Sequence, residues 1–124
     1  MGKNQFDYLV EVESEEIVRG VQPDFSRLVT VEARGVIVTS RASSQGYDFV
    51  SRFFAPRVGV NEDPVTGSAH CCLTPYWCCK LGEDQLVGYQ ASLRGGVVRV
   101  CVGGDRVSLG GQAVTVLRGE LVCD

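Results

Sequence analysis

The sequence predicts an α+β domain in which a curved, mostly antiparallel sheet wraps around one central apolar helix. The helix is predicted because nearly every position from Ala69 to Leu81 is apolar, so that a helix there has little polar face for solvent. The sheet is predicted because the last third of the chain alternates short β-rich runs with glycine turns, which is typical of antiparallel hairpins. All 124 residues are expected to form one domain with its own core.

In the first half of the chain, alternating side chains predict a strand at residues 6–12. Ser14, followed by acidic and then apolar residues, predicts a short helix up to Val21, and residues 23–28 indicate the start of a second one. A flexible polar loop is expected at residues 42–46. On either side of this loop lie β-rich runs that favour strands, at residues 28–31, 35–39 and 47–54.

In the second half, Pro75 lies inside the predicted helix and removes one backbone hydrogen bond, so a kink or a break is expected near Thr74. Gly82 is expected to end the helix. Four strands are predicted after it, at residues 90–93, 97–102, 106–109 and 113–117.

The start of the central helix is the candidate functional site. Gly67 lets a ligand approach the backbone, and the free N–H groups of Gly67, Ser68 and Ala69 carry the positive end of the helix dipole. Such a turn can hold a carboxylate or a phosphate. Ser68 adds a hydroxyl, and Asp63 could orient a substrate amine or hydroxyl or help to move a proton.

Each of these residues also has a structural interpretation. Asp63 before Pro64 is typical of a helix N-cap, Thr66 could be a cap as well, and local sequence alone favours caps because they are commoner than active sites. Arg94 could clamp an anionic substrate or could pair with a nearby carboxylate of the loop, Glu62 or Asp63, and the second role is slightly favoured. His70 could face a cleft, but a buried core histidine is the favoured interpretation.

An ordered series of motifs covers almost the whole chain, from Pro23 to Gly119, at residues 51–56, 62–70, 90–96, 105–107 and 111–114. Asp-Pro-Val-Thr-Gly-Ser-Ala-His at 63–70 is the most specific of them. Together they resemble the C-terminal half of the PhzF family of phenazine-biosynthesis-like isomerases, whose fold is similar to that of diaminopimelate epimerase.

The resemblance implies an isomerisation by proton transfer, without metal or organic cofactor, in a cleft between two similar halves. It implies that Asp63 takes part in catalysis and that Gly67 and Ser68 hold the substrate, a small carboxylate-bearing molecule. The family's acid/base glutamate comes from the N-terminal half, and nothing upstream of Phe6 could supply it. Glu62 is disfavoured as a substitute because it belongs to the second half's own motif.

The chain is therefore expected to be a truncated product, a splice form or an isolated second domain, inactive or weak on its own. A non-catalytic module that binds small anions or another protein is the alternative. A lone half should expose an apolar face, so pairing with a second copy and pairing with a missing N-terminal half both stay open.

Composition argues against several other functions. A net charge of −3 provides no basic surface for nucleic acid, and no apolar run reaches the roughly 20 residues that a membrane span needs. No signal peptide is evident, so a cytoplasmic location is expected. The cysteines lack the Cys-x-x-Cys spacing of a zinc site, and no bound metal is expected. They are expected to be reduced thiols, at positions 71, 72, 78, 79, 101 and 123.

Overall fold

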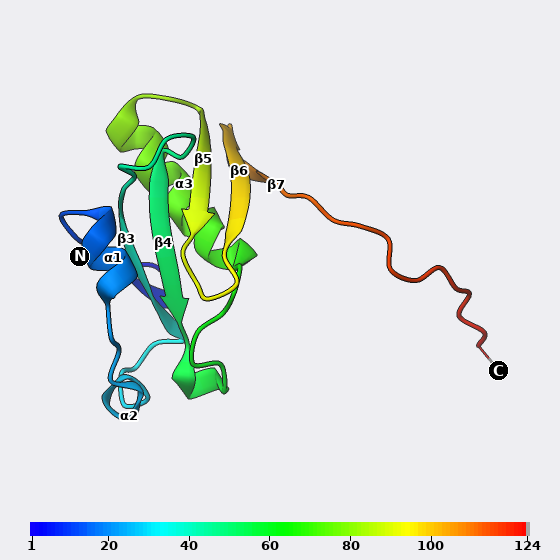
Figure 1. The fold of residues 1–124 in the computed structure, drawn as a ribbon, viewed down its shortest axis with the longest axis horizontal. Helices are drawn as coiled ribbons and strands as arrows, with labels where there is room; N and C mark the ends of the chain where they lie inside the picture. Colours follow the sequence, from blue (N-terminus) through cyan, green and yellow to red (C-terminus); the bar gives the residue numbers. More distant parts are fainter. Residues whose placement is uncertain (124) are drawn as a thin grey trace.

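The computed structural model describes residues 1–123, which contain one seven-stranded sheet with helices on both faces (Figure 1). The strands are β1 (Gly2–Lys3), β2 (Asp7–Glu11), β3 (Gly35–Arg41), β4 (Phe49–Phe54), β5 (Gln85–Gln90), β6 (Gly96–Gly103) and β7 (Arg106–Gly110). The helices are α1 (Glu15–Gly20), α2 (Phe25–Leu28) and α3 (Gly67–Leu81), with a short 3-10 turn, η1, at Pro56–Val58.

The strands lie in the sheet in the same order as along the chain. Only two neighbouring pairs are parallel, β2 with β3 and β4 with β5, and the other four pairs are antiparallel. A parallel pair needs a long crossover connection. The segment with α1 and α2 provides the first crossover, and α3 provides the second. The predicted α+β class with a mostly antiparallel sheet is confirmed.

The main core lies between α3 and the inner face of the sheet. Leu73 is fully buried, and the indole of Trp77 stacks on Phe49 with ring centroids 6.1 Å apart. Trp77 Nε1 also donates a hydrogen bond to Thr39 Oγ1 at 3.0 Å, which connects the helix to β3. Gly88 in β5 makes room for Phe49, because a Cβ there would lie 2.5 Å from the end of the ring.

A smaller apolar cluster lies on the outer face of the sheet, beneath α1 and α2. Val18 of α1 is fully buried there. As predicted, Ser14 caps α1, because its Oγ accepts a hydrogen bond from the N–H of Ile17 at 3.3 Å. The second helix predicted after Pro23 is present as α2, which Asp24 caps in the same way.

Of the kink or break predicted near Thr74, the break is wrong, because α3 runs without interruption from Gly67 to Leu81. Pro75 lies on the exposed face of the helix, with Cys71 and Cys79. The carbonyl that loses its partner to Pro75 is that of Cys71, and on this face water can hydrogen-bond to it. Gly82 ends α3 as predicted, in the left-handed conformation with a φ of 71°.

Three other strand predictions need correction. Leu28 is the last residue of α2, and residues 29–31 form turns after it, in which the N–H groups of Thr30 and Val31 bond to carbonyls three residues earlier. The strand expected at 90–93 lies earlier in the chain, because β5 runs from Gln85 to Gln90 and only Gln90 belongs to both ranges. Residues 113–117 form no strand, because the segment from 111 to 123 projects away from the domain and pairs with no described strand (Figure 1).

None of the helices in residues 1–123 combines the length and the hydropathy that crossing a membrane requires.

Candidate anion-binding site at the start of α3

The first turn of α3 is open to ligands. Gly67 and Ser68 are exposed, and within residues 1–123 the N–H groups of Gly67, Ser68 and Ala69 have no hydrogen-bond acceptor. Thr66 occupies the N-cap position, yet its hydroxyl bonds to Asp63 Oδ2 at 2.5 Å instead of capping the helix. The interpretation of Asp63 as the N-cap is therefore wrong, and the helix dipole faces solvent uncapped.

A groove of about 890 Å³ begins at Gly67 and runs along β6 and β7. Arg94 and Gly95 lie at its rim, in the turn between β5 and β6. Asp63 is not among the lining residues, and no other described carboxylate lines the groove. Arg99 lines the groove as well, so the groove combines the free N–H of Gly67 with two guanidinium groups, a combination that suits an anion.

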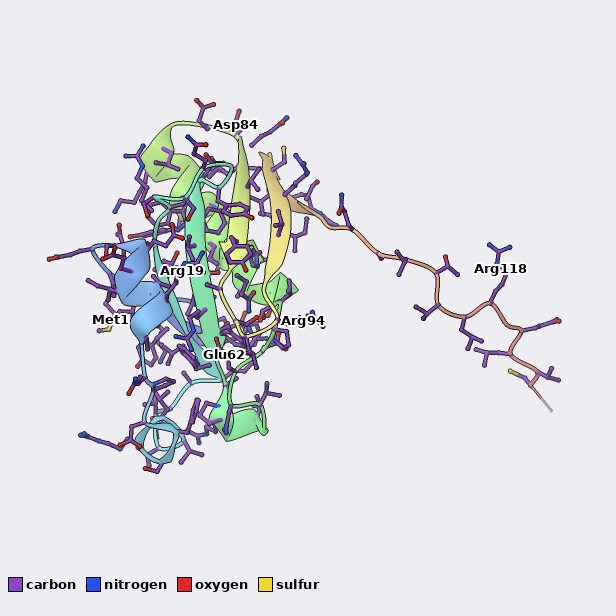
Figure 2. All side chains as sticks on the ribbon, in the orientation of Figure 1. Met1, Arg19, Glu62, Asp84, Arg94 and Arg118 are labelled. Carbon is purple, nitrogen blue, oxygen red and sulfur yellow. The ribbon has the colours of Figure 1, made fainter. Side chains whose placement is uncertain are left out.

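Arg94 is exposed and forms no ion pair with any described carboxylate. Glu62 pairs instead with Arg52, whose Nε and Nη2 donate to the two carboxylate oxygens at 2.8 and 3.0 Å. Arg52 also donates to three carbonyls at the end of α1, so it links that helix to the loop before α3. The favoured structural role of Arg94 is therefore wrong. Figure 2 shows Arg94 and Glu62 toward one end of the sheet, opposite Asp84.

Ser68 faces a second cavity, of about 480 Å³, on the other side of the helix start. Arg34 Nη2 donates to Ser68 Oγ at 3.1 Å, while the same guanidinium forms an ion pair with the fully buried Asp7. Asp7 raises the pKa of Arg34 through this hydrogen bond. Because the Ser68 hydroxyl accepts from Arg34, its own proton is free to be donated to a ligand.

His70 belongs to the core, as the favoured interpretation predicted. It is fully buried, and its ring centroid lies 6.0 Å from that of Phe49. Nδ1 lies 2.7 Å from the carbonyl of Thr66, which can only accept, so Nδ1 carries the proton. Nε2 is buried without a partner in the described chain. Burial lowers the pKa of His70 more than this hydrogen bond raises it, so the ring is neutral at neutral pH.

Gln90 and Ser92, at the end of β5, hold the loop before α3. The Gln90 side chain is fully buried and bonds to the backbone of Asp63 and Thr66. Ser92 Oγ donates to the carbonyl of Pro64 at 2.8 Å. Sequence reasoning gave these two residues no role, and none to Arg34, because contacts between residues 24 or more positions apart leave no local pattern.

Gly96 allows the same loop to lie close to β6. A Cβ at Gly96 would be 2.2 Å from Cγ2 of Val65, a β-branched side chain with little freedom to move. We expect Gly96→Ala to lower the free energy of unfolding by about 1–3 kcal/mol and to shift the backbone amide signals of residues 65–69.

Urea unfolding and amide NMR spectra would check this prediction. Gly103→Ala is the matched control, because it lies at the other end of β6 and a Cβ there has nothing within 4 Å. Equal losses of stability in the two variants would contradict the proposed close contact.

Comparisons with known proteins agree with this fold. The family model for phenazine biosynthesis-like proteins, PhzC-PhzF, matches residues 3–119. An uncharacterised isomerase of Halalkalibacterium halodurans is 57% identical over 122 residues, which cover 98% of this chain and 46% of that protein. An uncharacterised isomerase of Pseudomonas aeruginosa is 53% identical over 113 residues, covering 91% of this chain and 42% of that protein.

Solved structures show the same similarity. A phenazine biosynthesis PhzC/PhzF protein from Clostridium difficile superimposes with a TM-score of 0.82 and 36% identity, over 94% of this chain and 45% of the other. A PhzF-family protein from Enterococcus faecalis has a TM-score of 0.79 and 44% identity, over 83% of this chain and 39% of the other. The chain spans less than half the length of these relatives.

Proposed function

The chain belongs to the phenazine biosynthesis-like PhzC-PhzF family, and from this premise we propose that it is one half of a cofactor-independent isomerase for a small carboxylate-bearing substrate. The reaction would remove a proton from one carbon of the substrate and return a proton elsewhere on the same molecule, so that substrate and product are isomers. A location in the cytoplasm, with reduced thiols, is part of the proposal.

One observation carries this proposal: Gly67, the first residue of the uncapped helix α3, lines the same groove as Arg94. The substrate carboxylate would accept hydrogen bonds from the N–H groups of Gly67, Ser68 and Ala69, while Arg94 supplies a positive charge. A fixed carboxylate places the reacting carbon at a defined distance from the base, which is how anchoring assists proton transfer.

Asp63 is the proposed acid/base or orienting residue of this half. One of its carboxylate oxygens accepts from Thr66, and the other has no hydrogen-bond partner in the described chain. The acid/base glutamate is expected to belong to the half that the relatives have in addition. We therefore expect this chain alone to bind a small carboxylate and to turn over little or no substrate.

The proposed anchor can be tested by titrating isotope-labelled protein with benzoate and following the backbone amides by NMR. The expected result is a saturable shift centred on residues 67–69. Arg94→Ala should weaken benzoate binding about fivefold, the effect of losing about 1 kcal/mol of charge-assisted contact.

Arg106→Ala is the matched control, because Arg106 is also exposed but does not line the groove. The anchor would be refuted if wild-type amides 67–69 did not respond to benzoate. A role for Arg94 would be refuted if both arginine variants bound as tightly as the wild type.

A non-catalytic binding module is the second candidate. It is favoured by the lack of any carboxylate among the described residues that line the groove. Mixing this chain with the N-terminal half of a relative would separate the two candidates, because an isomerase half should gain activity and a binding module should not. Size measurements on the chain alone would show whether it pairs with a second copy.

A further inference from the structure

We propose that Gln90 and Ser92 are positioning residues that keep the first turn of α3 uncapped and set its position relative to Arg94. This inference deepens the proposed function and rests on it. Gln90 is the last residue of β5 and Ser92 follows it closely, and both side chains bond to the loop before α3.

Gln90 is fully buried, and its amide contacts three groups of one short loop. Its Oε1 accepts from the N–H of Thr66 at 2.7 Å, and its Nε2 donates to the carbonyl of Asp63 at 2.8 Å. Nε2 also lies 3.1 Å from Thr66 Oγ1. An N–H can only donate and a carbonyl can only accept, so these partners fix the orientation of the amide.

The amide also fixes the direction of the Thr66 hydroxyl. Because Thr66 Oγ1 accepts from Gln90 Nε2, its single proton is donated to Asp63 Oδ2, at 2.5 Å. A threonine at the N-cap position normally turns its oxygen toward an N–H group in the first turn of the helix. Gln90 and Asp63 hold this oxygen elsewhere, so the first-turn N–H groups stay available to a ligand.

Ser92 contacts the same loop at Pro64. Its Oγ donates to the carbonyl of Pro64 and accepts from the N–H of Gly95 at 3.0 Å, so it joins the loop before α3 to the turn that carries Arg94. Gly95 has a φ of 72°, a conformation that glycine adopts readily. Gln90 and Ser92 together therefore fix the position of the first-turn N–H groups of α3 relative to the turn that carries Arg94.

Gln90→Met tests this role, since methionine has a similar volume but cannot make these hydrogen bonds. Without the hydrogen bond from Gln90, the Thr66 hydroxyl can turn toward the helix. We expect benzoate affinity to fall at least about fivefold and the N–H residual dipolar couplings of residues 67–69 to change. Thr66→Val removes the hydroxyl itself, and in that background Gln90→Met should reduce affinity much less if Gln90 acts through Thr66.

Thr39→Val is the matched control. Thr39 is equally buried and makes side-chain hydrogen bonds to Val50 and Trp77, so this variant also loses buried hydrogen bonds but leaves the loop intact. It should lose stability while keeping benzoate affinity and the couplings of residues 67–69. Equal changes in the Thr39 and Gln90 variants would overturn the proposal, as would unchanged couplings in Gln90→Met.

Two further outcomes are distinguishable. Suppose that wild-type protein does not bind benzoate, and that Gln90→Met changes the couplings of residues 67–69 while Thr39→Val does not. The positioning role would then stand and the proposed anchor would fail. If Gln90→Met did not fold, Ser92→Ala would decide, since Ser92 is only half-buried. Altered N–H couplings at residues 65 to 67 and 94 to 95 with weaker binding would support the proposal, and a wild-type spectrum would overturn it.

Discussion

Replacing Glu15 with alanine is expected to lower the free energy of unfolding by about 3 kcal/mol at neutral pH. The Glu15 side chain is almost fully buried and accepts from the N–H groups of Ser43 and Ser44 at 2.8 and 3.0 Å. The Ser44 hydroxyl donates at 2.6 Å, and Arg19 donates twice. Burial alone would raise the pKa of Glu15, but these hydrogen bonds outweigh it and lower the pKa to about 2.

The loss of stability in Glu15→Ala should become smaller as the pH falls. The folded-state pKa of Glu15 lies below its ordinary value of 4.5, so the unfolded state binds more protons in acid. The stabilisation by Glu15 is complete above about pH 4.5 and is lost as pH falls toward 2. Denaturant unfolding of wild type and Glu15→Ala at several pH values would show their difference shrinking over this range.

The neighbouring Glu16 provides the matched control, because it lies in the same helical turn but is exposed. Glu16→Ala should change stability by about 0.5 kcal/mol or less. The account of Glu15 would be wrong if both variants lost equal stability, or if the loss in Glu15→Ala stayed constant between about pH 7 and pH 3.

Trp77→Ala should have a comparable or larger effect, of about 3–5 kcal/mol. The indole is 2% exposed, stacks on Phe49 and donates to Thr39, so its removal leaves a cavity between α3 and the sheet. Trp77→Phe should lose only about 1–2 kcal/mol, because the ring contact is largely kept while the hydrogen bond is removed. Urea unfolding followed by circular dichroism is the suitable measurement, since Trp77 is the single tryptophan of the chain.

Cys79→Ala is the control for Trp77→Ala. It tests whether the loss of stability comes from removing a buried side chain rather than from any substitution in α3. Cys79 lies two residues after Trp77 on the same helix but is exposed, so the substitution should change stability little. A loss in Trp77→Ala that matched the loss in Cys79→Ala would show that the indole contributes little to the core.

Sequence reasoning found the features of this chain that are encoded locally. Ser14 begins one helix and Gly82 ends another, each through a bond or a conformation within a few residues, and such positions have recognisable residue types. β5 was missed because two of its inward-facing residues are Gly88 and Gln90, which break the apolar alternation that marks a strand.

The opposite error, a strand predicted at residues 113–117, has a related cause. Residues with high β-propensity form a strand only when a neighbouring strand binds their backbone groups, and this segment has no such neighbour in the described chain. Figure 2 shows Arg118 far from the sheet, on the projecting segment. In the candidate site, the substrate-binding role that the motif predicts for Gly67 and Ser68 stays a prediction. The ion pair of Arg52 with Glu62 leaves no local pattern, because it requires β4 and the loop before α3 to be placed together.

The strand order has a consequence for how the chain folds. β3 with β4 and the β5–β6–β7 meander pair segments that are close in sequence, so their loops close at small entropic cost. Joining these two units requires Phe49 of β4 to meet Gly88 of β5 across the whole of α3, which is a much longer loop. This junction is also where the Phe49 ring lies against the glycine, so the most expensive loop closure coincides with formation of the aromatic core. Folding of this domain is therefore expected to be limited by the docking of the β3–β4 hairpin against the β5–β6–β7 meander around α3.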